Sequence, residues 1–186
     1  MKGSTEKIAI TGGKYRGRKI ATPGGKTHPM GSRERLALFN MLSGKLESTL
    51  ILDAFAGSGA LGIEALSRGA EKVVFVDESA EAVKTIQSNL RELGIFDGFK
   101  VIKGTFPQVD LSEFVGFDII LADPPYDDFE KIDLDFLGNL LKDGGILILS
   151  HPEQAPEIRG FKLIKTHTYA AARLSVYKFI LDNHTP

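Results

Sequence analysis

Residues 50–62 read LILDAFAGSGALG, and this stretch decides the fold. An apolar, strand-like run ends at Asp53, a glycine-rich loop follows, and a helix-like run begins at Ala60. Such a turn directs the free N–H groups of the new helix at a ligand above the loop. The stretch therefore predicts a site for a nucleotide-derived cofactor at the end of a parallel strand.

Strand-like and helix-like segments alternate along the remaining chain, without repeats or low-complexity stretches. This alternation is typical of a parallel sheet covered on both faces. The expected strands are 50–53, 72–77, 100–103, 118–122 and 146–150, and the expected helices are 60–68, 79–93 and 132–141, with a turn at 142–145. Two later runs, 161–168 and 174–181, are too close together for a crossover helix, so we expect an antiparallel hairpin.

Five parallel strands followed by an antiparallel hairpin outline the class I methyltransferase fold, a Rossmann-like α/β fold with a mostly parallel sheet of seven strands. A dinucleotide-binding domain would continue with crossover connections instead. A chain of 186 residues can build one sizeable core but not two full domains. We expect a catalytic domain at residues 46–186, preceded by a small basic extension at residues 1–45.

The composition excludes several kinds of chemistry. The chain has no cysteine, which excludes disulfides, thiolate metal sites and carbon-5 pyrimidine methylation through a covalent thioether. No apolar run approaches the roughly 18 residues of a membrane helix, and residues 1–7 lack the apolar core of a signal peptide. We therefore expect a cytoplasmic protein without metal or membrane partner. No exposed apolar stripe settles the oligomeric state, and we expect a monomer because a large substrate would have to reach the mouth of the sheet.

The net charge of -1 hides an uneven distribution. Residues 1–45 carry ten lysines or arginines against two acidic residues, whereas the remainder has an excess of acidic residues. Residues 14–19, KYRGRK, place cations around one aromatic ring and one glycine, which suits phosphate contacts and stacking on a base or sugar. The alternative is a solvated tail, but the base-modifying motif described next favours a nucleic-acid arm.

The tetrapeptide DPPY, residues 123–126, follows the strand-like run 117–122. An exocyclic amine conjugated to its ring is a poor nucleophile until acceptors localise its lone pair. The Asp123 side chain and the Pro124 carbonyl can be those acceptors. Pro124 and Pro125 fix their direction, and Tyr126 can stack on the base. The motif predicts methyl transfer to a nucleobase amino group, with the proton passing to Asp123 or water; the alternative is an ordinary Pro-Pro turn.

The glycine loop alone does not identify the cofactor, because its GxGxxG spacing also fits dinucleotide sites that have an acid near the position of Asp77. Asp53 separates the two readings, since a carboxylate there repels a pyrophosphate but suits the ammonium of a methionine moiety. We therefore expect S-adenosylmethionine, with Asp77 on the ribose and the adenine near residues 104–106. The expected cofactor residues are Asp53, Phe55, Gly57, Gly59, Asp77, Gly104 and Thr105. The structural alternatives are a turn residue for Asp53 and a helix N-cap for Asp77.

The chain resembles the RsmD family of 16S ribosomal RNA guanine-N2 methyltransferases over residues 10–181. The resemblance rests on GGKYRGRK at 12–19, the segment 33–40, the glycine-rich segment 53–69 and the DPPY motif. It implies a guanine of the small-subunit RNA as target during ribosome assembly, residues 123–126 at that base, and 16S RNA or the 30S subunit as partner. The implied RNA contacts are Lys14, Arg16, Arg18, Lys19, His28, Arg33 and Arg35.

The chain departs from the family pattern in one loop. Where the family usually has Arg-Pro-Thr, this chain has His28, Pro29 and Met30, so an imidazole replaces a guanidinium. His28 can still contact a phosphate or the base, but a surface histidine beside a proline is more often structural or solvated. In the helix that follows, Ser32 as N-cap and a core stripe of Leu36, Phe39 and Leu42 would explain much of the sequence without RNA.

Two other functions fit parts of the sequence. DPPY alone also suits a DNA amino-methyltransferase acting on adenine N6 or cytosine N4, although the chain has no segment large enough for a separate sequence-reading domain. RNA in an assembling particle can be recognised by shape and a short basic arm. The third possibility is a non-catalytic RNA-binding assembly factor that keeps the cofactor fold.

Overall fold

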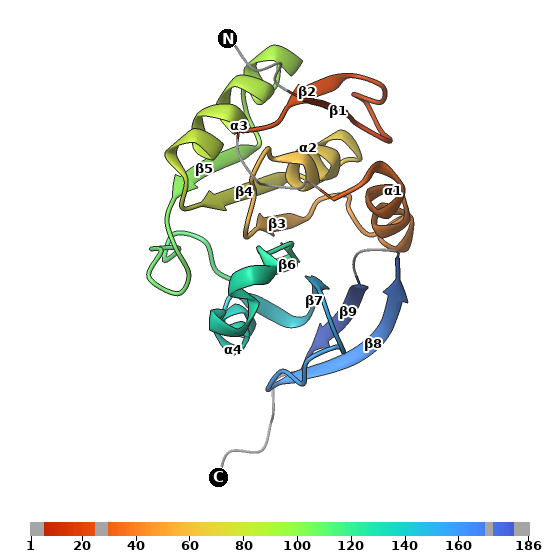
Figure 1. Ribbon diagram of the computed structural model, residues 1–186, viewed down its shortest axis with the longest axis vertical. Helices are drawn as coiled ribbons and strands as arrows, with labels where there is room; N and C mark the ends of the chain where they lie inside the picture. The colour runs from red at the N-terminus through yellow and green to blue at the C-terminus, as the bar shows by residue number, and fades with distance from the viewer. Residues whose placement is uncertain (1–5, 25–29, 170–172, 181–186) are drawn as a thin grey trace.

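The computed structural model describes residues 6–24, 30–169 and 173–180. A seven-stranded sheet in the order β5-β4-β3-β6-β7-β9-β8 forms the centre of the molecule (Figure 1). Five strands are parallel: β3 (Leu50–Asp53), β4 (Lys72–Asp77), β5 (Phe99–Lys103), β6 (Phe117–Ala122) and β7 (Leu141–His151). Strand β9 (Arg173–Phe179) is antiparallel to β7 and to β8 (Phe161–Thr168). The mostly parallel sheet with a C-terminal antiparallel hairpin is thereby confirmed.

Neighbouring residues of each central strand point to opposite faces of the sheet, and both faces are buried. Ile51 and Phe75 belong to the apolar cluster on one face, and Leu52 and Val74 belong to the cluster on the other. The first face is covered by α1 (Ser32–Met41), α2 (Ala60–Ser67) and α3 (Ala80–Leu93), and the second by α4 (Leu134–Gly138) and the segments around it (Figure 1). The strands therefore read as nearly continuous apolar runs.

Helix α3 forms where its sequence predicts it. The Ser79 hydroxyl accepts a hydrogen bond from the Ala82 N–H as N-cap, and Gly94 ends the helix in the left-handed region at φ 75°. Ile86 and Leu90 are buried against the sheet. The capping serine, the terminal glycine and the apolar face all indicate the same helix, so its observed bounds match the expected range 79–93 closely.

Helix α1 presents a different face from the one expected. Its N-cap is Gly31 rather than Ser32, and Leu36 is 43% exposed. Phe39 and Leu42 are buried as expected, and Arg35 and Leu38 take the place of Leu36 in the buried stripe. The reason is Arg35, whose guanidinium donates hydrogen bonds to two backbone carbonyls and can therefore enter the core with the apolar residues.

The segment between β6 and β7 also differs from the sequence prediction. A single helix at 132–141 is replaced by the 3-10 helix η1 (Tyr126–Lys131) and the short α4, whose N-cap Asp133 accepts from the Phe136 N–H. The turn expected at 142–145 lies inside β7, where Gly144 has φ 72° and the register with β6 shifts. The glycines therefore form an irregularity within a long strand rather than a turn before a short one.

The basic N-terminal part forms a hairpin that the sequence did not predict. Strands β1 (Lys7–Ala9) and β2 (Lys19–Ala21) pair antiparallel and lie over α2 and α3. Ile10 and Ile20 join the same apolar cluster as α1, α2 and α3. The Asn89 side chain pairs with both backbone polar groups of Ala21. Residues on both sides of position 45 thus share one core, and the division at 45/46 stays a prediction.

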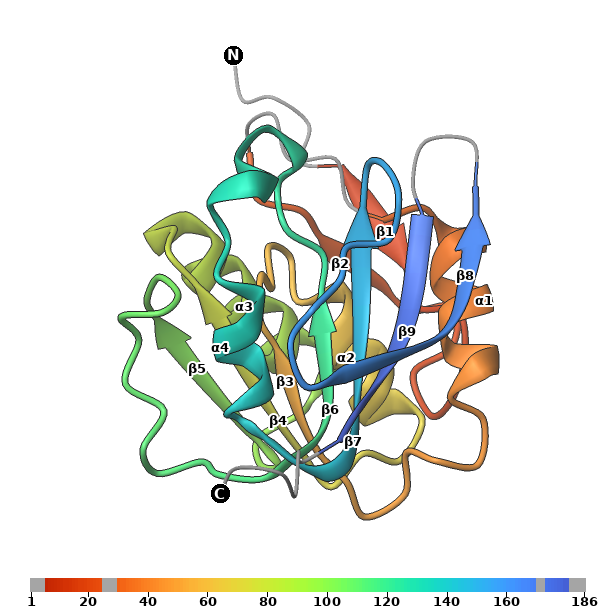
Figure 2. The same cartoon turned by 90° about the horizontal axis from the view of Figure 1, so that it is seen from below.

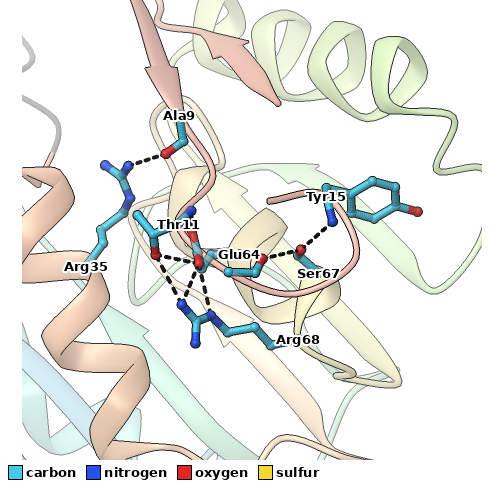
Figure 3. A network of polar contacts seen from close by, with 8 residues as sticks. Ala9, Thr11, Tyr15, Arg35, Glu64, Ser67 and Arg68 are labelled. Atoms are coloured by element: carbon cyan, nitrogen blue, oxygen red, sulfur yellow. Dashed lines mark hydrogen bonds and ion pairs between the residues drawn. The ribbon is translucent and has the colours of Figure 1, made fainter. Parts of the chain in front are cut away.

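A buried polar network fastens this hairpin to α2 (Figure 3). Glu64 is fully buried, and its carboxylate accepts hydrogen bonds from the N–H and hydroxyl of Thr11 and from Arg68 Nε. Ser67 donates its hydroxyl to the Gly12 carbonyl and accepts from the Tyr15 N–H. The helix therefore supplies the partners that the loop backbone needs in the interior. Among the described residues, no helix is long and apolar enough to cross a membrane.

Candidate active site

The predicted cofactor and base residues gather at one edge of the sheet. In Figure 2 the parallel strands point toward this edge, where η1 lies beyond the end of β6. Asp53 ends β3, Asp77 ends β4, Gly104 follows β5 and Asp123 follows β6. The charges of Asp77 and Asp123 both act on the Asp53 carboxyl, so the three acids are close in space. Ligands of open α/β sheets bind at this carboxyl edge.

The glycine loop is held open by its backbone conformation. Gly57 has φ 52° and Gly59 has φ 78°, a region that side chains with a Cβ rarely adopt. The Gly57 N–H donates to Asp77 Oδ2 at 2.7 Å, which joins the ends of β3 and β4. A Cβ on Gly57 would meet nothing within 4 Å. Glycine is therefore required here by backbone conformation, and the space beside it is open.

Asp53 caps the helix that follows the loop. Gly59 is the N-cap of α2 and has no side chain to satisfy the first N–H groups. Asp53, buried at the end of β3, accepts a hydrogen bond from the Gly62 N–H at 2.8 Å. Burial raises the pKa of Asp53 to about 7, and the nearby Asp123 and Asp77 act in the same direction, while the bond from Gly62 opposes them. Asp53 therefore has a structural role as acceptor for the first turn of α2, in addition to its predicted role at the cofactor.

Replacing Asp53 by asparagine should make the protein relatively more stable as the pH rises. The folded protein holds the Asp53 proton more tightly than the unfolded chain, so the stability from this group is full below pH 4 and is lost as the pH rises through about 7. Asparagine keeps an acceptor for the Gly62 N–H but has no charge to bury. The free energy of unfolding of Asp53→Asn, taken relative to wild type, should be larger by about 2 kcal/mol at pH 8 than at pH 5. Urea denaturation without cofactor at both pH values measures this; an equal difference at both would contradict it.

Asp77 uses its carboxylate to organise two backbone segments. Oδ2 accepts from Gly57 and Oδ1 accepts from the Ser79 N–H at 2.8 Å. The N-cap of α3 is Ser79, so the alternative reading of Asp77 as N-cap is wrong by two residues. A carboxylate has about four acceptor positions, which leaves room for ribose hydroxyls.

A hollow of about 640 Å³ lies beyond the end of β5. It is lined by Gly104 and Thr105, which were expected beside an adenine, and also by Gln108 and Asp110. The Thr105 hydroxyl donates to Glu78 Oε2 at 3.4 Å, a contact with the end of β4 that the sequence did not suggest. Phe55 packs against the Phe106 ring at a centroid distance of 5.6 Å. Phe55 therefore contributes an aromatic wall near this edge, in addition to its place in the glycine loop.

The DPPY motif turns the chain sharply at the end of β6. Pro124 is buried and Pro125 is exposed, and Tyr126 begins η1. Burial raises the pKa of Asp123 to about 6, although a hydrogen bond with the Ser150 side chain opposes this shift. The Tyr126 hydroxyl lies 2.7 Å from Ser150 Oγ. Ser150 therefore contacts the tyrosine at the end of the motif.

Ser150 is a site residue that the sequence reading missed. It is buried near the carboxyl end of β7, beside the ends of the other parallel strands. Its position at the end of a parallel strand could have identified it in the sequence, because residues at the ends of parallel strands line this edge. A groove of about 360 Å³ lies beside Tyr126, with Phe129, Glu130, Pro152 and Glu153 among its other lining residues.

The basic turn at residues 12–19 lies at the opposite edge of the sheet. The Lys14 N–H donates to the carbonyl of Ser67, the last residue of α2, and an Arg18 Nη2 donates to the carbonyl of Glu92 near the end of α3. Both helices run away from the cofactor edge, so about 12 Å or more separates this turn from the glycine loop. Four exposed cations extend from it: Lys14, Arg16, Arg18 and Lys19.

The other predicted RNA contacts divide into three cases. Arg33 is exposed in the first turn of α1. Tyr169 follows the end of β8, and its pKa is raised by burial and by the neighbouring charge of Glu34. The first turn of α1 therefore lies near the edge of the sheet where the parallel strands end. Arg35 is 1% exposed and binds the carbonyls of Met30 and Ala9, which corrects its assignment as an RNA contact, because its donors serve the core. His28 lies outside the described residues.

Metal binding finds no support in the part of the chain that the structure describes. In these ranges no three or more histidine, aspartate or glutamate side chains are grouped so that they could hold a metal ion. The three acids of the site lie at separate strand ends, and Asp53 and Asp77 are engaged by backbone N–H groups.

Comparisons with known proteins agree with this geometry. The family described as conserved hypothetical protein 95 matches residues 8–178. The Bacillus subtilis protein YlbH is 31% identical over 181 residues, 92% of this chain and 98% of YlbH. Ribosomal RNA small subunit methyltransferase D of Escherichia coli is 34% identical over 141 residues, 75% of this chain and 69% of that protein. The solved structure of Escherichia coli yhhF matches with a TM-score of 0.80 at 26% identity, covering 94% of this chain and 99% of the other. The chain belongs to the family of conserved hypothetical protein 95, the RsmD family that its motifs resemble.

Proposed function

We propose that this protein methylates the exocyclic N2 of a guanine in 16S ribosomal RNA, using S-adenosylmethionine, during assembly of the small subunit. The observation that carries the proposal is the meeting of the DPPY motif and the glycine loop at one edge of the sheet. Each motif alone has an ordinary structural explanation. Together they put a base-binding turn beside a cofactor loop in a chain of the RsmD family.

The residues at this edge fit S-adenosylmethionine. The open space at Gly57 admits a ligand close to the backbone, Asp77 has free acceptor capacity for ribose hydroxyls, and the hollow at Gly104 and Thr105 can take a purine. The acidic Asp53 suits the ammonium of the methionine moiety and disfavours a pyrophosphate. When bound, S-adenosylmethionine supplies an electrophilic methyl group on sulfur.

The base side requires acceptors and a proton sink. The Asp123 carboxylate and the Pro124 carbonyl would accept hydrogen bonds from the amino group and so localise its lone pair for attack. A methyl group supplied by the cofactor would leave the nitrogen with a surplus proton, which Asp123 or water would accept. Burial gives Asp123 a pKa of about 6, so the carboxylate is mainly ionised at neutral pH but basic enough to accept that proton.

A large, structured RNA suits the distribution of cations. The first turn of α1, which carries Arg33, lies near Tyr169 after the end of β8, whereas residues 14–19 lie about 12 Å or more from the glycine loop, at the other edge. Small-subunit RNA can span both positions, whereas a short oligonucleotide in the base site cannot reach the basic turn. We therefore place its action on the subunit or an assembly intermediate in the cytoplasm. The monomeric state stays a prediction.

Removing two cations of the basic turn should weaken RNA binding without slowing the bound complex. Arg16→Ala combined with Arg18→Ala is expected to lower affinity for small subunits about tenfold at moderate salt and to reduce the salt slope by about two. The rate at saturating subunits should stay near wild type. A matched control replaces Lys162 and Lys165, two exposed cations on β8. Equal losses in both double variants would contradict a specific role for the turn.

Methyl transfer with labelled S-adenosylmethionine tests the proposed function. Purified protein is offered unmodified 30S subunits, naked 16S RNA and duplex DNA, and the modified nucleoside is identified by mass spectrometry. N2-methylguanosine in ribosomal substrates supports the proposal. N6-methyladenine or N4-methylcytosine in DNA would instead favour the DNA amino-methyltransferase, and cofactor binding without any transfer would favour the assembly factor.

A further inference from the structure

We propose that His151 is a positioning residue that fixes the shape of the groove beside Tyr126, where a nucleobase of the RNA substrate lies, an inference that rests on the proposed function. His151 ends β7 and is fully buried, so it does not touch the RNA itself. Its ring contacts both walls of the groove. One wall is η1, reached through Phe129, and the other is the bend at residues 152–154, reached through Glu153.

The chemistry of the groove suits a base rather than a phosphate. It continues from the DPPY motif, because Tyr126 is one of its lining residues, and Phe129 and Leu134 add surface on which a base can stack. The carboxylates of Glu130 and Glu153 can accept hydrogen bonds from base N–H groups and would repel the RNA backbone. Among the described residues that line the groove, none is a cation.

The hydrogen bonds of His151 determine which ring nitrogen carries the proton. Nδ1 lies 3.0 Å from the Glu153 carbonyl oxygen, which can only accept, so Nδ1 must be protonated. Nε2 lies 2.8 Å from Ser175 Oγ and accepts the serine proton in the neutral ring, a state that agrees with a pKa lowered by burial. The Ser175 oxygen then accepts from Thr166, whose hydroxyl lies 2.7 Å away. Donation therefore runs from β8 across β9 to β7 and ends at the bend.

This arrangement fastens the bend to the sheet and to η1. The guanidinium of Arg173, at the start of β9, donates to the Pro152 carbonyl, and His151 donates to the next carbonyl, that of Glu153. Both carbonyls of the bend thus have side-chain donors. The His151 ring also packs on the Phe129 ring at a centroid distance of 6.4 Å. Loss of the imidazole should therefore let the two walls of the groove move apart.

Two substitutions separate the hydrogen bonds from the bulk of the ring. His151→Asn keeps an amide N–H near the position of Nδ1, so the bond to Glu153 can persist. His151→Phe keeps a ring beside Phe129 but removes both hydrogen bonds. His167→Phe is the matched control. His167 pairs with Leu174, a residue of the apolar cluster on the α1 side, so its side chain lies on the other face of the sheet.

Methyl transfer to 30S subunits tests the functional consequence. His151→Phe should lower kcat about tenfold to a hundredfold, because misplacing a bound base by about an ångström has an effect of this size. The affinities for subunits and for S-adenosylmethionine should stay near wild type, since the basic turn and the glycine loop are untouched. His151→Asn should recover most of kcat, and His167→Phe should behave as wild type. Unchanged kcat in His151→Phe, or an equal loss in the asparagine variant or the control, would overturn the proposal.

Fluorescence of the free protein tests the same role without turnover. The chain has no tryptophan, so Phe129→Trp places a single indole in the η1 wall beside His151. Adding His151→Phe should shift the emission to longer wavelength as the groove opens to water, whereas adding His151→Asn should leave it nearly in place. An emission that His151→Phe does not change would contradict the proposal. Wild type that methylates no RNA substrate would refute the proposed function instead, and the fluorescence comparison would still decide whether His151 holds the groove.

Nitrogen-15 NMR of the wild-type protein tests the hydrogen bonds even if a variant fails to fold. The chain has four histidines, which keeps the imidazole spectrum simple. The His151 ring should be neutral, with its proton on Nδ1. A proton on Nε2 alone would show that the ring does not donate to the bend, and the proposal would fall.

Discussion

Asp123→Ala is expected to abolish most methyl transfer while leaving the protein folded and able to bind RNA. The substitution removes an acceptor for the amino protons and the nearest proton sink, so kcat should fall by roughly 10²-fold to 10⁴-fold. The basic turn, the proposed RNA contact, lies at the other edge of the sheet, so RNA affinity should not change. Single-turnover transfer to 30S subunits measures the loss, and filter binding measures RNA affinity.

Stability separates this result from simple unfolding. Burial raises the pKa of Asp123 to about 6, so the ionised carboxylate opposes folding at pH 8 and its removal should not lower the free energy of unfolding there. Asp123→Asn tests the proton sink, since it keeps an acceptor oxygen but cannot take a proton. Asp127→Ala, an exposed acid on η1, is the control. Full activity in Asp123→Ala would exclude the proposed chemistry.

Glu64→Ala should destabilise the protein more than any surface substitution. The carboxylate is fully buried and satisfies the Thr11 N–H and hydroxyl and Arg68 Nε (Figure 3). Its removal leaves these donors, and a partly buried guanidinium, without their acceptor. Breaking a buried pair of this kind costs about 3–5 kcal/mol in the free energy of unfolding. Urea denaturation measures the change.

Glu64→Ala should also increase local opening of the β1–β2 hairpin more than that of the central sheet. Thr11 follows β1, and Glu64 is its link to α2, so backbone amides of residues 7–21 should lose hydrogen-exchange protection first. Glu64→Gln keeps the shape and one acceptor, so a smaller loss is expected, and the exposed Glu71→Ala should have little effect. An unchanged midpoint in Glu64→Ala would show that the network adds nothing to stability.

Much of the fold was readable because local signals and burial pointed the same way. Strands 50–53 and 72–77 are apolar runs buried on both faces, and α3 has a serine cap, an apolar face and a glycine stop. The β1–β2 hairpin was not predicted, since each strand is only three residues long, Lys-Ile-Ala, and the hairpin and its turn gain polar partners from α2 and α3. Arg35 was misassigned for a similar reason, because an arginine enters a core only where distant carbonyls accept its protons.

The sequence by itself determined the parallel sheet, the edge at which its acids meet and the family to which the chain belongs, because strand periodicity and motif order are local properties. The tertiary structure decided what each polar group contacts. It joined Ser150 to the DPPY motif, set Glu64 under Thr11 and moved the basic turn to the far edge from the base site. These contacts link residues 24 to 53 positions apart. Spacing along the chain cannot reveal them, since the packing of helices on the sheet creates them.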